Sequence, residues 1–179
     1  VTVPGQVAGW KALSERFGKL PFAQLFEPAI AYAEEGFAVS PTIARQWATQ
    51  APKLAQEPGF AAAFLPEGRA PQAGEWWRFP EQGKTLRAIA ESGGESFYRG
   101  ELAQKIADFA SQTGGALSAQ DLAEHRPEWV APISQSFRGY ELHEIPPSGQ
   151  GISALMALGM LEQFDLESMG RDSVDYYHV

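Results

Sequence analysis

Residues 140–164 read YELHEIPPSGQGISALMALGMLEQF, and this stretch decides the fold class. Residues 140–145 alternate in the two-residue period of a half-buried strand. Pro146 and Pro147 end the strand because proline has no N–H to donate to a ladder. The turn at 148–151 then leads into a helix that is apolar almost all round, and such a helix has to be buried between layers. We therefore expect a layered α/β protein.

Apolar spacing and turn residues divide the rest of the chain into short helices. Ser40 is suited to cap a helix that has Pro41 at its first position, and Pro28 should kink or break the helix that contains it. The pattern predicts the end of a strand at 1–3, helices at 6–17, 22–35, 40–54, 84–91 and 100–112, a short capped helix at 118–125, and an uncapped helical segment at 173–179. It also predicts an irregular stretch at 57–83 and an antiparallel strand pair at 129–137 and 139–145.

This reading predicts a mainly helical α/β chain with a C-terminal β-hairpin and no separate domains within residues 1–179. The chain contains no internal repeat, low-complexity tract or linker. It opens in mid-strand and closes in mid-helix, which we interpret as the mark of an internal fragment of a longer protein.

Composition excludes several classes of function. A chain of 179 residues with 44% hydrophobic and 20% charged residues is long enough for one sizeable core. The net charge of -8 without a Lys/Arg cluster argues against nucleic acid as a partner, and the longest apolar stretch is too short for a membrane span. There is no cysteine, and the three histidines are far apart, so we predict no metal site and no cofactor.

Ser148 is the residue whose position most resembles that of a nucleophile. It lies at a strand–turn–helix junction, where a nucleophile elbow would place a serine. Pro146 occupies the place of the first glycine of that motif, and no Asp/His pair follows in order. We therefore favour a turn or N-cap role for Ser148.

Glycines near helix starts offer a second candidate, which is anion binding. Gly149 and Gly151 could expose backbone N–H groups to an anion, although a tight turn or close packing is the favoured interpretation. Gly5 and Gly9 match no phosphate-binding fingerprint, and close helix packing is again favoured.

Other chemistry-bearing residues have simple structural explanations. Trp76 and Trp77 could stack a sugar or peptide but more often would anchor a loop. His143 is expected on the solvent side of its strand or hydrogen bonded. The carboxylates Glu34, Glu35, Glu162, Asp165 and Glu167 are expected at a solvated surface, without a catalytic pair.

Six sequence blocks in order resemble the γ-glutamyltransferase (γ-glutamyltranspeptidase) family. Each is weak alone, but together they cover essentially the whole chain. They are 3–10 (VPGQVAGW), 17–22 with 28–37 (FGKLPF and PAIAYAEEGF), 85–90 with 97–100 (TLRAIA and FYRG), 114–115 with 121–122 (GG and DL), 138–140 (RGY) and 146–151 (PPSGQG).

The resemblance implies a self-processing N-terminal nucleophile hydrolase with an αββα sandwich. In that family a precursor cuts itself, and the threonine exposed at the start of the small subunit attacks γ-glutamyl amides, with its own α-amino group as the base. This chain resembles the middle of the large subunit. The threonine would then lie beyond Val179 and the carboxylate-binding arginine before Val1, so no catalytic residue is assigned here and the binding residues stay unknown. The implied partners are the small subunit and an amide substrate, in the bacterial periplasm or cytoplasm.

The block at 146–151 departs from the usual transpeptidase pattern. Transpeptidases carry PPSSGG where this chain has PPSGQG, a form that resembles the branch with glutaryl-cephalosporin acylases. The departure weakens the expectation of transpeptidation and leaves that of amide hydrolysis unchanged. The alternative from another class is a stand-alone helical module that binds a small molecule or a protein without catalysis.

Overall fold

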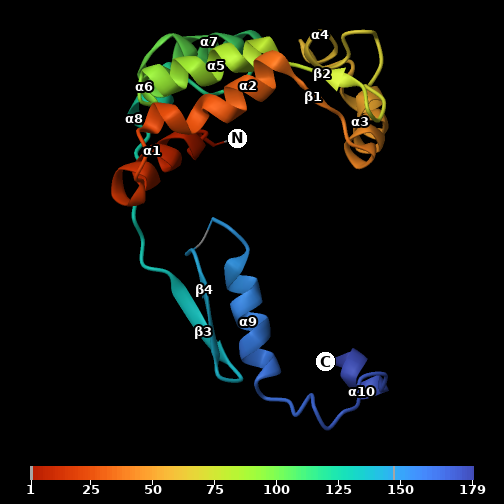
Figure 1. Cartoon of the computed structure of the whole chain (residues 1–179). Coiled ribbons are helices and arrows are strands. Elements are labelled where there is room, and N and C mark those ends of the chain that lie inside the picture. The colour runs from red at the N-terminus through yellow and green to blue at the C-terminus, as the bar shows by residue number, and fades with distance from the viewer. Residues whose placement is uncertain (1, 147) are drawn as a thin grey trace. The chain divides into compact units, whose positions relative to one another are not determined.

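The computed structural model describes residues 2–146 and 148–179, and it separates into two compact units, Val1–Pro127 and Glu128–Val179. Its described residues are mainly helical and include the predicted C-terminal hairpin, and they also form a second small sheet, from residues 37–38 and 76–77, that was not predicted. The interpretation of residues 1–179 as one internal fragment without separate domains stays a prediction. Unit 1 contains α1 (Gln6–Phe17), the 3-10 helix η1 (Phe22–Phe26), α2 (Glu27–Glu35), β1 (Phe37–Ala38), α3 (Pro41–Leu54), α4 (Phe60–Phe64), β2 (Trp76–Trp77), α5 (Pro80–Glu91), α6 (Glu95–Arg99), α7 (Glu101–Gln112) and α8 (Ala119–Glu124) (Figure 1). Unit 2 contains β3 (Ile133–Phe137), β4 (Tyr140–Glu144), α9 (Gly151–Leu161) and α10 (Val174–His178).

Several predicted boundaries are confirmed. Pro28 lies in the first turn of α2, where the chain changes from η1 to α-helix, so the predicted break is present. Gly36 ends α2 with φ of 93°, a conformation that favours glycine. Ser40 caps α3 by accepting a hydrogen bond from the Ile43 N–H at 3.4 Å, with Pro41 at the first helical position.

Other predictions are wrong at the two ends of the chain, at the start of α5, and between the glycines at 94 and 100. Val1 lies outside the described residues, and neither Thr2 nor Val3 is in a strand, because no described strand pairs with them. Helix α5 starts at Pro80 rather than at residue 84, since proline is tolerated at a first helical position. Helix α6 was not predicted, and α10 is capped after all, because the Ser173 hydroxyl accepts from the Tyr176 N–H at 3.1 Å.

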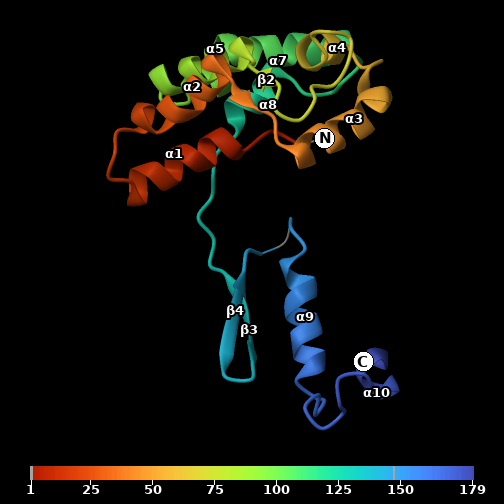
Figure 2. The same cartoon turned by 45° about the vertical axis from the view of Figure 1, so that its right-hand side comes forward.

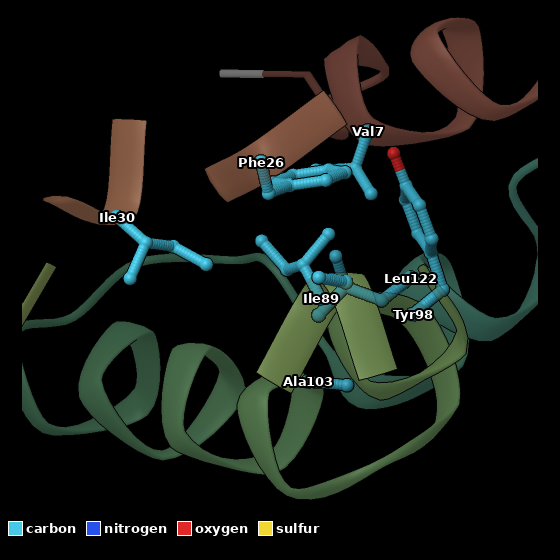
Figure 3. Packing of buried hydrophobic residues seen from close by; sticks show 8 residues of the cluster. Val7, Phe26, Ile30, Ile89, Tyr98, Ala103 and Leu122 are labelled. Atoms are coloured by element: carbon cyan, nitrogen blue, oxygen red, sulfur yellow. The ribbon is translucent and has the colours of Figure 1, made fainter. Parts of the chain in front are cut away.

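Unit 1 has a core formed by α1, η1, α2, α5, α6, α7 and α8. Helix α2 packs along α5, and α6, α7 and α8 pack on one another (Figure 1). Figure 3 shows how the core side chains converge from these elements. Burying such apolar side chains is the main source of folding free energy. The cluster consists of Val7, Phe26, Ile30, Ile89, Ala90, Tyr98, Ala103 and Leu122.

The N-terminus of α1 is capped from a distant part of the sequence. Gly5 has no side chain to accept a hydrogen bond from the first turn. The Tyr98 hydroxyl replaces it by accepting from the Ala8 N–H at 3.0 Å and donating to the Pro4 carbonyl at 2.8 Å. In Figure 3 this hydroxyl points to the side of the cluster that carries Val7. The His125 ring stacks on Tyr98, with ring centroids 5.3 Å apart, so α6 and α8 together hold the start of α1.

Unit 2 is a β-hairpin covered on one face by α9 (Figure 2). The strands are antiparallel, with Ile133 opposite Glu144 and Phe137 opposite Tyr140, which confirms the predicted pairing, although the first strand begins at Ile133 rather than at residue 129. Helix α9 is buried less than its sequence predicts. Only Leu155 is buried among its described residues, while Ile152, Met156 and Met160 are 43%, 61% and 60% exposed. The expectation that α9 is enclosed between layers is wrong within unit 2, because the hairpin covers one side of the helix only.

Candidate functional site

The turn that follows β4 does not form a nucleophile elbow. Helix α9 begins after Gln150, which is its N-cap, so Ser148 is an exposed turn residue rather than the cap. The structure therefore confirms a turn role for Ser148 but not the alternative of an N-cap. No acid–base partner of Ser148 occurs among the hydrogen bonds of the described residues, so the turn lacks the pairing that would activate a serine.

Gly151 serves close packing rather than anion binding. A Cβ built on it would lie 2.5 Å from Glu144 Oε2 and 2.7 Å from Glu144 Cβ. The Glu144 side chain thus packs against Gly151 in the first turn of α9, and a negative charge near a helix N-terminus is favourable to the helix dipole. Nothing lies within 4 Å of a Cβ built on Gly149, so close packing is wrong at that position. The favoured interpretation of Gly151 is confirmed.

The exposed face of the hairpin carries a Ser–Glu–His group. Ser134 Oγ donates to Glu141 Oε1 at 2.8 Å, and His143 Nε2 lies 3.4 Å from Glu141 Oε2. The carboxylate therefore lies between the hydroxyl and the imidazole. A catalytic triad needs the imidazole next to the hydroxyl, so this arrangement cannot activate Ser134 as a nucleophile. His143 is exposed, as predicted, and the group forms a polar face opposite α9.

Trp76 and Trp77 anchor the irregular stretch, as predicted. Strand β2 pairs with β1, and the Trp76 indole donates to the Glu35 carbonyl at 2.7 Å. Trp77 packs on the Trp47 ring with centroids 5.0 Å apart and on Phe64 at 6.3 Å. The indole ring of Trp77 is committed to an aromatic cluster and is not presented to a sugar.

The acidic candidates have structural partners or face solvent. Glu34 is not a purely solvated residue, because both of its carboxylate oxygens accept from Arg87 Nη2, at 2.7 and 2.8 Å, which joins α2 to α5. The Arg87 pKa is raised by this hydrogen bond and by the charge of Glu34. Glu35, Glu162, Asp165 and Glu167 are exposed, as expected. Within the described residues no group of carboxylates and histidines could hold a metal ion.

A second charged pair holds the loop before β2. Arg69 forms two hydrogen bonds with Glu75, at 2.8 and 2.9 Å, and Glu67 also accepts from Arg69. The hydrogen bond from Arg69 and that from the Gln72 N–H lower the pKa of Glu75 to about 2. A perturbed carboxylate of this kind is typical of catalytic sites but also of structural ion pairs. Here the partners are all within one loop, so the pair fastens that loop.

Gly5 and Gly9 differ in how closely other parts of the chain approach them. A Cβ on Gly5 would lie 3.2 Å from His125 Nε2, so close packing is confirmed there. Nothing lies within 4 Å of such an atom on Gly9, so close packing is wrong at that position. His125 Nε2 is buried and has no hydrogen-bond partner among the described residues.

The sequence did not predict an apolar groove on unit 1, which contains no catalytic group. An open apolar groove of about 530 Å³ lies between α1 and η1. The stripe Trp10, Leu13 and Phe17 on α1 was visible as a helical period, but its partial exposure was not, because the sequence does not show what fails to cover it. Among the described residues no helix combines the length and apolarity needed to cross a bilayer.

Comparisons with known proteins agree with the six sequence blocks. The profile of the gamma-glutamyltranspeptidase family matches residues 1–179, and the chain belongs to this family of enzymes. It is 38% identical over 179 residues to the glutathione hydrolase-like YwrD proenzyme of Bacillus subtilis (strain 168), covering 100% of this chain and 34% of that protein. It is 38% identical over 180 residues to the acylase ACY 1 proenzyme of Pseudomonas sp. (strain SE83), covering 100% of this chain and 32% of that protein.

A solved structure gives the same result. The cephalosporin acylase from Bacillus halodurans is 48% identical with a TM-score of 0.92, over 99% of this chain and 34% of that chain. The chain therefore spans about a third of the length of these relatives.

Proposed function

We propose that this chain is a large-subunit segment of a self-processing amidohydrolase precursor that cleaves γ-glutamyl or glutaryl-type amides. The family match over residues 1–179 carries the proposal. The nucleophile would be the threonine that self-cleavage exposes at the start of a small subunit, with its α-amino group as the general base. Residues 1–179 would supply scaffold rather than a reacting group.

The geometry of unit 2 supports the scaffold role. The hairpin has a helix on one face and the polar group of Ser134, Glu141 and His143 on the other. This is half of what an αββα sandwich requires, in which each sheet has helices outside and a second sheet inside. We propose that another part of the precursor covers the exposed side of α9, because exposed apolar faces of this kind mark interfaces.

Two named relatives support hydrolysis of an acyl amide. One carries the name of a glutathione hydrolase-like proenzyme, and the other is named an acylase proenzyme. The sequence PPSGQG at 146–151 adds to the support, since it resembles the acylase branch. We propose water rather than an amine as the main acceptor of the acyl group.

Expression of the full-length precursor tests the proposal. We expect two polypeptides on a denaturing gel, with a threonine at the new N-terminus by peptide sequencing. The mature protein should release nitroaniline from γ-glutamyl-p-nitroanilide or from a glutaryl anilide, and alanine in place of that threonine should abolish the release. The isolated 179-residue chain should release none. Turnover by the isolated chain, or a precursor that is active without cleavage, would contradict the proposal.

The second candidate is a stand-alone binding module without catalysis. The open groove between α1 and η1 favours it, because such a groove could hold a ligand without help from another chain. The two candidate functions predict different oligomeric states and unfolding behaviour for the isolated chain in solution. A self-contained module should be monomeric and unfold in one cooperative transition in urea, whereas a segment with an uncovered apolar face should self-associate.

A further inference from the structure

A second pocket on unit 1, separate from the apolar groove, has charged walls. It lies between α1, α6 and the segment that follows α8, and its volume of about 300 Å³ is at the lower end of the range for small-molecule sites. The sign and arrangement of charges in a pocket select among ligands, which an apolar lining alone does not do. The charged side chains that line it are Lys11, Glu15, Glu95, Arg99 and Arg126.

Two guanidinium groups of this pocket converge on one carbonyl oxygen. Arg99 Nη2 and Arg126 Nη1 both donate to the Ala123 carbonyl, each at 2.8 Å, and Arg126 Nη1 also donates to the His125 carbonyl at 2.7 Å. A single arginine is enough to satisfy a carbonyl in the last turn of a helix. The second guanidinium brings a like charge close to the first, an arrangement that an anion beside both groups would stabilise.

The charge of Arg126 is not offset by a carboxylate. Glu15 lies 3.0 Å from Lys11, and Glu95 accepts from Arg99 at 2.9 Å, so these two pairs each cancel. Among the described residues, the hydrogen bonds of Arg126 go only to neutral carbonyls, which fix the guanidinium without neutralising it. They use Nη1 alone, so the edge formed by Nε and Nη2 is available to a ligand. The pocket is therefore net positive on a chain whose net charge is -8.

From this arrangement we infer that the pocket binds a phosphate group, either inorganic phosphate or a phosphate monoester. A tetrahedral phosphate offers oxygens to two guanidinium groups at once, whereas the two oxygens of a carboxylate match the fork of one. The phosphate lies against the open edge of Arg126 and reaches Arg99, for which it competes with Glu95. The inference goes beyond the proposed function and does not depend on it, since neither the nucleophile nor the small subunit takes part.

Phosphorus NMR tests the inference by titration of inorganic phosphate with the full-length, processed protein. The ionic strength is held constant, because salt screens exposed charges. We expect saturable line broadening, with the affinity weakened roughly five- to tenfold by Arg126→Gln. Arg45→Gln on α3 is the matched control, since it removes the same charge outside the pocket and should leave the affinity unchanged. Acetate, as a carboxylate probe, should displace phosphate only at roughly tenfold higher concentration.

A variant that gains affinity separates binding from folding. Glu95→Gln removes the carboxylate that competes for Arg99, so it should tighten phosphate binding roughly two- to fivefold. A misfolded pocket would not bind more tightly. Glu57→Gln is the control, because it removes the same charge from an exposed residue outside the pocket.

Four results would overturn the inference. They are the absence of saturable binding, equal affinity in Arg126→Gln and Arg45→Gln, no tighter binding by Glu95→Gln than by Glu57→Gln, and displacement by acetate at the same concentration as by phosphate. The titration does not measure amide hydrolysis, so failure here and failure of the proposed function are separate results.

Discussion

Residues 1–127 and residues 128–179 differ in how completely each unit buries its own apolar side chains. Unit 1 encloses a cluster that runs from Val7 to Leu122, whereas Leu155 is the one buried apolar side chain of unit 2 among the described residues. Yet the sequence of α9 is more apolar than the sequences of the helices that form the core of unit 1. Apolar composition therefore predicts that a surface has to be covered but does not say by what. Unit 1 covers this cluster with its own helices although its α1 stripe stays partly exposed, and we propose that another part of the precursor covers α9 in unit 2.

The largest expected effect on stability comes from shortening a buried side chain in the core of unit 1. Leu122 is 0% exposed, so Leu122→Ala should lower the free energy of unfolding by about 2–5 kcal/mol. Met156→Ala in unit 2 should change it by less than about 0.5 kcal/mol, because that side chain is mostly exposed. Urea unfolding of the 179-residue chain measures both. Equal losses would mean that the two units do not differ in the way described.

The next effect concerns the packing of α9 on the hairpin. Gly151→Ala places a Cβ within 2.7 Å of Glu144 Cβ, which cannot swing away as a side-chain end could. We expect a loss of about 1–3 kcal/mol from this overpacking. Gly149→Ala is the control, since nothing lies within 4 Å of its added Cβ. Circular dichroism during urea unfolding should separate the two variants, and equal stability would refute the close approach.

The distant cap on α1 should give a smaller loss. Tyr98→Phe removes the hydroxyl and leaves the Ala8 N–H and the Pro4 carbonyl without their partner. The expected cost is about 1–2 kcal/mol, with faster hydrogen exchange at the Ala8 amide. Tyr140→Phe, on an exposed residue of β4, should change neither. An unchanged Ala8 amide in the first variant would show that Tyr98 does not cap α1.

The smallest effect is the pH dependence of the loop before β2. The pKa of Glu75 is lowered to about 2, so its ion pair with Arg69 stabilises the fold above the ordinary pKa of glutamate and is lost as the pH falls through about 2. Arg69→Gln should raise the pKa of Glu75 toward the ordinary value, as measured by carboxyl-carbon NMR. Lys53→Gln, on α3, serves as the control. An unshifted Glu75 titration in Arg69→Gln would refute the pairing.

Local signals predicted much of the fold. Gly36, Pro28 and Ser40 act within one or two turns of their own position, so the ends of α2 and α3 were visible in the sequence. Helix α6 was missed because it is a short segment between the glycines at 93–94 and at 100, which read as loop. The cap from Tyr98 could not be predicted, because it joins residues 90 positions apart.

The candidate sites divide in the same manner. Structural roles for Ser148, Gly151 and the two tryptophans follow from neighbouring residues and were predicted. The pairing of Glu34 with Arg87 and the opening of the groove depend on how helices pack, which no local pattern contains.

Hydrogen exchange of α9 tests the central claim most directly, which is that unit 2 presents an apolar surface to another part of the precursor. The amides of Met156 and Met160 would be followed in the 179-residue chain and in the mature protein, with those of Ile89 in α5 as the internal reference. We predict that protection of α9 rises strongly in the mature protein while that of α5 changes little. Equal protection of α9 in both samples would contradict the account.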